Sequence, residues 1–216
     1  MAILNQKINI NNFLHEACGV VHVGASIGQE RDLYASHGLS VLWIEPIQEI
    51  FNILSDKIRP YKNQIAVQAL VTDVDGKDYS FNISNNAGKS SSIFELNQHK
   101  DIWPKIAYQS KRNITSTTLS TVFKTRQIQE ECYNTLIMDT QGSELLVLQG
   151  AIPILRNFKF IKTEAADFES YVGNCYLRDI NSFMNEYGYT EMCRETHKLK
   201  RDGRNYYDVV YRRCDS

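Results

Sequence analysis

A glycine-rich turn and an acidic residue stand at the ends of two successive apolar runs. The turn spans Gly24 to Gly28, and Glu45 ends the next run. Such a turn between a strand and a helix lets a ligand approach bare backbone at the positive end of the helix. A carboxylate at the next strand end can accept hydrogen bonds from both ribose hydroxyls of an adenosine. We therefore predict that Gly24, Ala25, Ser26, Gly28 and Glu45 bind a nucleoside cofactor, the alternative being an ordinary tight turn and a surface glutamate.

The glycine spacing favours a nucleoside that has no pyrophosphate. A dinucleotide site has the pattern G-x-G-x-x-G, whereas only Gly24 and Gly28 occur here. S-adenosylmethionine has no phosphate, so a looser turn is sufficient. A nicotinamide-dependent oxidoreductase is one alternative, but its third glycine and its Tyr/Lys pair near the fourth strand are not apparent. A non-catalytic nucleoside-binding protein of the same fold would keep the turn and lose the acidic residues further along the chain.

Three residues could act on a second substrate that carries a hydroxyl group. His99 is the one histidine in the long polar segment 84–118, and an imidazole with a pKa of about 6.5 suits proton removal from an alcohol. We predict that His99 is either the general base or a residue that binds the acceptor. Asp139 and Glu164 each end an apolar run, and either could be the base instead of His99. The structural alternatives are a solvated loop histidine and a carboxylate that caps a helix. The three could also form a divalent metal site, but no local spacing supports one, so we predict no metal.

Uncharged polar side chains and an aromatic residue could bind the acceptor. Asn86, Ser91 and Ser92 supply hydrogen-bond donors and acceptors without net charge, as a sugar or an adenosine requires. Tyr171 could stack on a ring, although buried aromatic residues are commoner. Asn and Ser runs also form flexible turns, so a purely structural role for this segment remains the alternative.

Short apolar runs alternate with helical patterns, which predicts an α/β fold. We expect a Rossmann-like, mostly parallel seven-stranded sheet with helices on both faces. The expected strands are 19–23, 41–45, 65–71, 135–139, 160–164, 189–194 and 206–211. The expected helices are 29–36, 46–58, 143–148 and 177–186. Only a turn separates the last two strands, so they should form an antiparallel hairpin at the end of the chain.

Length and composition indicate one domain over residues 1–216, with a polar extension at 1–12 and a functional insert at 84–118. A net charge of −1 gives no general attraction to nucleic acid. No apolar run approaches the roughly 20 residues that span a bilayer. Five scattered cysteines are typical of free thiols in a reducing cytoplasm. We expect a small-molecule or glycan acceptor, and the sequence does not predict an oligomeric state.

The run Asp139-Thr140-Gln141-Gly142-Ser143-Glu144-Leu145, followed by Gln149-Gly150-Ala151, resembles the signature of the FkbM family of methyltransferases. Other segments agree with the family pattern in the expected order from Gly19 onward. They include His22-Val23-Gly24-Ala25, Glu45-Pro46, Ser90-Ser91-Ser92-Ile93, Thr163-Glu164 and Tyr207-Asp208-Val209-Val210-Tyr211.

This resemblance implies a sheet that ends in a reversed seventh strand, S-adenosylmethionine as the methyl donor, and O-methylation of sugars, glycans or natural products. From its position at the strand end, Asp139 could bind the methionine part of the donor, orient the acceptor or act as the base. The chain departs from the family at His22, where an acidic residue is common, and at Ser120, where an aspartate is usual. We expect Glu30 to take over part of the missing acidic role near the donor's ammonium group.

Overall fold

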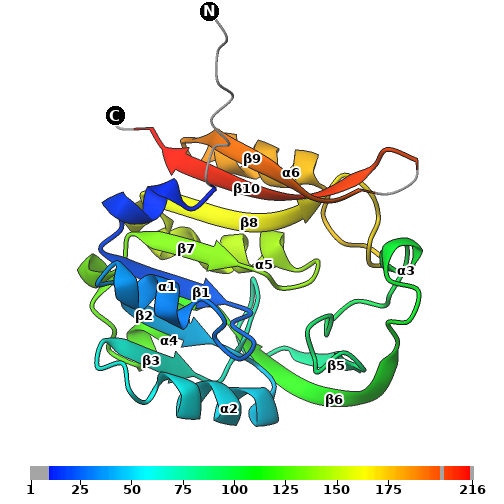
Figure 1. Cartoon of the computed structure of the whole chain (residues 1–216), viewed down its shortest axis with the longest axis horizontal. Coiled ribbons are helices and arrows are strands. Elements are labelled where there is room, and N and C mark those ends of the chain that lie inside the picture. The colour runs from blue at the N-terminus through cyan, green and yellow to red at the C-terminus, as the bar shows by residue number, and fades with distance from the viewer. Residues whose placement is uncertain (1–9, 200–201, 215–216) are drawn as a thin grey trace, which may run out of the picture.

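Two β-sheets make up the framework of the computed structural model, which describes residues 10–199 and 202–214. The large sheet has seven strands in the order β3-β2-β1-β7-β8-β10-β9 (Figure 1). Its strands are β1 (Gly19–Val23), β2 (Ser40–Ile44), β3 (Gln64–Val67), β7 (Thr135–Met138), β8 (Phe160–Ala166), β9 (Tyr189–Leu199) and β10 (Asn205–Arg213). β10 pairs antiparallel with both β8 and β9. The predicted mostly parallel sheet with a C-terminal antiparallel hairpin is confirmed.

The register of the parallel strands brings the predicted site residues to one edge. Val23 pairs with Ile44 of β2 and with Met138 of β7. Met138 in turn pairs with Thr163 of β8. Gly24, Glu45 and Asp139 therefore leave the sheet side by side at its carboxyl edge, which is where ligands bind in folds of this kind. Glu164 follows Thr163 but stays in β8, which continues to Ala166.

Helices cover both faces of the large sheet because its strands bear apolar side chains on both faces. On one face, Trp43 packs with residues of α1 (Arg31–Ser36) and α2 (Gln48–Ile58). On the other, Leu136 packs with residues of α4 (Leu119–Thr125), α5 (Glu144–Gly150) and α6 (Leu177–Glu186). Figure 1 shows α1 and α2 in front of the sheet and α5 and α6 behind it. The expected helix at 177–186 has the observed bounds, and α1 and α2 begin slightly later than expected.

A smaller three-stranded sheet, in the order β4-β6-β5, differs from the sequence prediction. Its strands are β4 (Leu70–Val71), β5 (Asp78–Ser84) and β6 (Tyr108–Thr117). Residues 65–71 are therefore not one strand, because Leu70 and Val71 leave the large sheet to pair with β6. The segment 84–118 is not a continuous loop, since it contains β6 and the short helix α3 (His99–Ile102). β6 is mostly exposed and polar, so it has no apolar pattern to reveal it.

An apolar cluster joins the smaller sheet to α2. Phe81 and Ile83 of β5 pack with Leu70, Ile47 and Ile50. Figure 1 shows β5, β6 and α3 on the side of the large sheet toward which β8 points. The smaller sheet therefore forms a wall beside the carboxyl edge where the site residues lie.

The expected polar extension at 1–12 falls mostly outside the described residues. From Ile10 the chain enters a 3-10 helix (Asn12–Glu16), whose Phe13 and Leu14 are buried on the α1 face of the sheet. Within 10–199 and 202–214, no helix is long and apolar enough to cross a bilayer.

We expect Ile83→Ala to weaken the attachment of the smaller sheet. Ile83 is buried against α2 and does not line the cavity described below, so the loss should come from packing alone. An unfolding free energy lower by about 2–5 kcal/mol is expected, against about 0.5–1.5 kcal/mol for the matched Ile83→Val. Urea denaturation measures both values. Equal effects of the two variants would contradict the packing role.

Candidate functional site

The turn after β1 lies directly against the turn after β7. Gly24 has a left-handed φ of +79°, and its N–H donates to the Ile44 carbonyl at 3.0 Å. A Cβ at this position would stand 2.0 Å from the Asp139 carbonyl oxygen. Only glycine fits between the two turns, and this close approach sets the distance from the predicted cofactor turn to Asp139.

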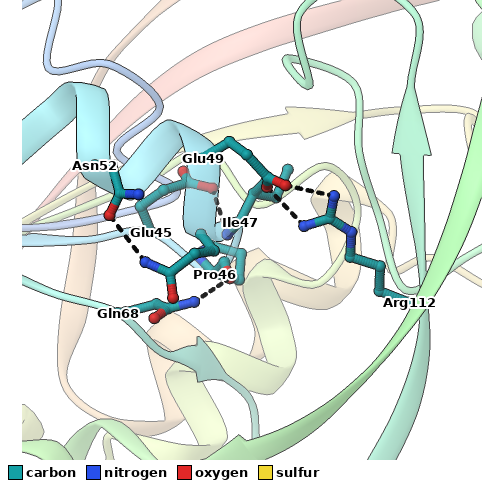
Figure 2. A network of polar contacts seen from close by, with 8 residues as sticks. Glu45, Pro46, Ile47, Glu49, Asn52, Gln68 and Arg112 are labelled. Carbon is teal, nitrogen blue, oxygen red and sulfur yellow. Dashed lines mark hydrogen bonds and ion pairs between the residues drawn. The ribbon is translucent and has the colours of Figure 1, made fainter.

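Glu45 is a buried carboxylate that holds two segments of backbone. It accepts a hydrogen bond from Ser26 N–H at Oε2 and one from Ile47 N–H at Oε1, each at 2.9 Å. Figure 2 shows the bond from Ile47. Burial raises the pKa of Glu45 to about 7, and the two N–H donors oppose that rise. Because a carboxylate has about four acceptor positions, Glu45 can still accept hydrogen bonds from ligand hydroxyls.

A polar network surrounds Glu45 and ties the smaller sheet to α2. The Arg112 guanidinium of β6 donates to both oxygens of Glu49, at 2.6 and 2.7 Å. Gln68 donates to the Pro46 carbonyl at 3.4 Å. In Figure 2 these pairs stand on either side of Glu45. The Arg112–Glu49 pair is bidentate, which fixes the orientation of β6 relative to the helix.

A cavity opens beside Glu45 and encloses about 680 Å³ including its open mouth. One end is polar, with Glu45, Ser26 and Asp139. The other end is an apolar slot lined by Ile47, Ile50, Ala69, Leu70, Val71 and Phe81. Gly88, Lys89 and Ser91 close it from the insert. An apolar surface beside a carboxylate suits the base and the ribose of a nucleoside.

Three of the predicted cofactor residues do not line this cavity. Ala25 is buried within the turn. Gly28 has a φ of +68°, and a Cβ there would stand 2.7 Å from Leu54 Cδ1, so Gly28 seats the turn on α2. Glu30 lines a neighbouring hollow that it shares with Asp139. Glu30 therefore lies near Asp139 and apart from the nucleoside end of the cavity.

His22, which stands where the family commonly has an acid, is a buried neutral residue. Its ring stacks on Trp43 at 5.1 Å, and its Nδ1 lies 3.2 Å from the Tyr34 hydroxyl. Burial lowers the pKa of His22 to about 4. It lines the same hollow as Glu30, and a neutral imidazole cannot replace the charge of a carboxylate.

Asp139 stands on a turn that a second buried carboxylate holds. Glu144 accepts hydrogen bonds from Thr140 N–H at 2.8 Å and from Gly142 N–H at 3.0 Å. Burial raises the pKa of Glu144 to about 7. Gln141 has a left-handed φ of +55°, which is uncommon for a residue other than glycine. The turn that follows Asp139 is therefore held in a strained backbone shape by hydrogen bonds from its own N–H groups to the Glu144 carboxylate.

Gln141 orients Asp139, a role that the sequence prediction missed. Its amide donates to Asp139 Oδ1 at 2.5 Å and accepts from the Tyr171 hydroxyl at 2.5 Å. Ser92 donates to the Gln141 carbonyl at 2.8 Å. Tyr171 and Ser92, predicted to bind the acceptor, therefore support the Asp139 turn. The position of Gln141 two residues after a strand-end aspartate was the available signal.

A second, polar pocket brings the three predicted catalytic residues together. It is lined by Asn86, Lys89, Ser90, His99, Trp103, Asp139, Gln141 and Glu164. Asp139 also lines the nucleoside cavity. Of the other predicted acceptor residues, Asn86 lines this pocket, whereas Ser91 lines the nucleoside cavity. Lys89 and Gln141 also line both spaces, so the two spaces meet at Lys89, Asp139 and Gln141.

His99 is a buried residue rather than a solvated loop histidine. It is only 3% exposed, and its ring lies 4.4 Å from that of Trp103 and 5.1 Å from that of Tyr171. Its Nδ1 lies 2.8 Å from the Tyr206 hydroxyl, and its Nε2 has no hydrogen-bond partner among the described residues. Burial lowers the pKa of His99 to about 4, so the imidazole is neutral at pH 7.

Glu164, predicted to end its strand, lies within β8, two residues before the strand ends at Ala166, and is paired with Asp208 of β10. Burial raises its pKa well above the ordinary value, and the negative charges of Asp139, Glu144 and Asp208 raise it further. Lys162 opposes this rise. The surroundings favour a neutral Glu164 carboxyl that can donate a hydrogen bond into the pocket. Within the described ranges, no group of three or more His, Cys, Asp or Glu side chains is placed to hold a metal ion.

The chain matches one family model and is similar in fold to solved structures of methyltransferases. The family model of the methyltransferase FkbM domain matches residues 22–191. No curated protein sequence matches the chain. The structure is similar to the putative tRNA (m1A22) methyltransferase Sp1610 of Streptococcus pneumoniae with S-adenosyl-L-methionine, at TM-score 0.52 and 9% identity, over 94% of this chain and 72% of that one.

It is also similar to the magnesium protoporphyrin IX methyltransferase of Synechocystis PCC 6803, at TM-score 0.51 and 10% identity. That match covers 90% of this chain and 69% of the other. Against Sp1610 without the donor, the chain spans 64% of the neighbour's length. At these identities the likeness shows the shared fold.

We expect the affinity for S-adenosylhomocysteine, the demethylated donor, to depend on the ionisation of Glu45. The carboxylate form accepts hydroxyl hydrogen bonds, and the free protein holds a proton on Glu45 below a pH of about 7. Binding must then release that proton, so the dissociation constant should rise up to about tenfold per pH unit below 7 and level off above it. Calorimetry across this range checks the trend. Glu45→Gln should bind more weakly and lose the pH step, and a step that persists would assign it to another group.

Proposed function

The chain belongs to the methyltransferase FkbM domain family, and from this we propose that it methylates a hydroxyl oxygen of a sugar, a glycan or another natural product. It is an S-adenosylmethionine-dependent methyltransferase with the Rossmann-like fold of such enzymes. The observation that carries the proposal for the acceptor is the meeting of the nucleoside cavity and the polar pocket at Asp139.

The residues of the cavity fit the donor. Glu45 would hold the ribose hydroxyls, and the slot between Ile50 and Phe81 would take the adenine. Asp139 and Glu30 would lie near the methionine part. Once bound, S-adenosylmethionine supplies a methyl group on a positively charged sulfur. The acidic residues near Asp139 suit that charge.

The polar pocket suits a hydroxyl-bearing acceptor. Asn86, Ser90 and Gln141 offer neutral hydrogen-bonding groups, and Trp103 offers an aromatic ring. Methyl transfer is an in-line displacement, so holding the acceptor oxygen in line with the methyl group is the main task of the protein. A base that removes the hydroxyl proton assists, and His99 and Asp139 both face the pocket for that role.

Two rival functions are weaker. A nicotinamide-dependent oxidoreductase lacks support from the family match, and a non-catalytic nucleoside-binding protein gives no reason for the polar pocket beside the cavity. The structural neighbours named for tRNA and porphyrin substrates share the fold and do not identify the acceptor.

We further propose one functional domain, a cytoplasmic location, and an acceptor that is a small molecule or a glycan rather than nucleic acid.

Calorimetry of the purified protein should show saturable binding of S-adenosylmethionine or S-adenosylhomocysteine. Glu45→Ala should weaken this binding by about 1–3 kcal/mol, because hydrogen bonds to a charged acceptor are lost. The exposed Asp56→Ala on α2, whose carboxylate pairs with Arg59 and does not line the cavity, serves as the control and should change the affinity little. No heat with either ligand, together with saturable NADH binding, would replace the methyltransferase proposal with the oxidoreductase.

A screen of candidate glycans for methyl incorporation, read by mass spectrometry, should identify an acceptor and allow variants to be compared. Asp139→Asn and His99→Ala should each lower kcat by on the order of 10²–10⁴ if the altered residue is the base. Whichever of these two variants removes only the base should bind the donor about as tightly as the wild type does. A raised acceptor KM with unchanged kcat would mark binding instead. The exposed Asp56→Asn on α2 is the control. Full activity in both site variants would place the acceptor elsewhere.

A further inference from the structure

We propose that Tyr206 fixes His99 in the neutral form that carries its proton on Nε2, so that His99 donates a hydrogen bond to the acceptor oxygen and Asp139 removes the acceptor's proton. This assignment rests on the proposed function. It makes Tyr206 a positioning residue and separates the roles of two residues that both face the polar pocket.

The imidazole of His99 is held in one orientation. Trp103 and Tyr171 lie against its ring, at 4.4 and 5.1 Å between centroids. Tyr206, on β10, approaches edge-on, with its hydroxyl 2.8 Å from Nδ1. Tyr206 is itself only 3% exposed. Nδ1 is therefore committed to Tyr206. Nε2 is buried and has no protein partner among the described residues, so it is the nitrogen left to bond an acceptor in the pocket that His99 lines.

The direction of the Tyr206–His99 hydrogen bond follows from the chemistry of the two groups. A neutral imidazole has one N–H and one basic nitrogen, and a phenol is a better proton donor than a neutral imidazole N–H. Tyr206 therefore donates to Nδ1, which leaves the proton on Nε2.

Burial supports this neutral form. The ring cannot readily become charged, because its surroundings are aromatic and its pKa lies near 4. A general base in this position would have to form a buried imidazolium beside Trp103. A hydrogen-bond donor does not change its charge during the reaction. The surroundings of His99 therefore suit a group that orients the acceptor.

Asp139 is placed to remove the proton. It borders both the donor cavity and the polar pocket, and Gln141 holds its Oδ1 at 2.5 Å. An acceptor hydroxyl has one hydrogen and two lone pairs. Its hydrogen faces the Asp139 carboxylate, one lone pair accepts from His99 Nε2–H, and the other lone pair points along the line to the methyl group.

The proposed step is balanced. The acceptor oxygen forms a bond to the methyl carbon as the carbon–sulfur bond breaks, and the electron pair of that bond passes to sulfur. The hydroxyl proton moves to the Asp139 carboxylate. His99 keeps its proton throughout, and Tyr206 keeps the imidazole from reversing its two nitrogens.

Nuclear magnetic resonance of the full chain, labelled with ¹⁵N at histidine and saturated with S-adenosylhomocysteine, tests the assignment. The signals of His99 are identified by their loss in His99→Gln. At neutral pH the wild type should show hydrogen on Nε2 and none on Nδ1. In Tyr206→Phe, the ratio of the Nε2–H form to the Nδ1–H form should fall by about fivefold or more, the effect of losing one buried hydrogen bond.

Tyr211→Phe is the matched control. Tyr211 is another buried tyrosine of β10, and its hydroxyl donates to Asn181 rather than to His99. A purely structural effect of removing a buried hydroxyl would appear in both variants, whereas the tautomer ratio should change only in Tyr206→Phe.

Hydrogen on Nδ1 in the wild type would overturn the proposal, and so would an unchanged ratio in a folded Tyr206→Phe. If that variant does not fold, the wild-type spectrum alone decides. Failure of the donor to bind would instead count against the proposed function, and calorimetry detects it independently of the histidine signals.

Discussion

The contact between Gly24 and the Asp139 carbonyl is the constraint on which the site depends. Two chain segments that are far apart in the sequence meet so closely that a single carbon atom would not fit between them. This contact exists because β1 and β7 are adjacent and in register at their carboxyl ends. It places the nucleoside cavity and the polar pocket on either side of Asp139. A larger residue at Gly24 would therefore change the distance between the two substrates as well as the local backbone.

Buried carboxylates hold the two turns that meet there. Glu45 accepts backbone N–H groups from the turn after β1 and from the start of α2, and Glu144 accepts those of the turn after β7. Each carboxylate loses hydration on burial, and the N–H donors offset part of that cost. Both turns also contain residues with left-handed φ, Ser26 and Gln141. The hydrogen bonds keep these shapes before a ligand arrives, which reduces the ordering that binding requires.

The insert at 84–118 supplies most of the residues that line the polar pocket. Arg112 and the apolar cluster around Ile83 attach the smaller sheet to α2, and α3 then carries His99 across to Tyr206 on β10. The polar pocket is thus lined by residues of the insert, of the turn after β7 and of β8, and the C-terminal hairpin contacts it through the Tyr206–His99 hydrogen bond. Because its walls come from separate elements, their relative positions depend on packing over the whole domain.

Local patterns in the sequence were enough to predict the large sheet, its reversed last strand and the positions of Gly24, Glu45, Asp139 and Glu164 at one edge. These features follow from apolar periodicity and from the rule that parallel strands end together. The sequence could not show that β6 is a strand, because its partner β5 lies well before it in the chain and its side chains are mostly exposed. Nor could it distinguish a solvated His99 from a buried one. Burial, the neighbours of a side chain and the direction of a hydrogen bond all come from residues distant in the sequence, so only the tertiary structure decided them.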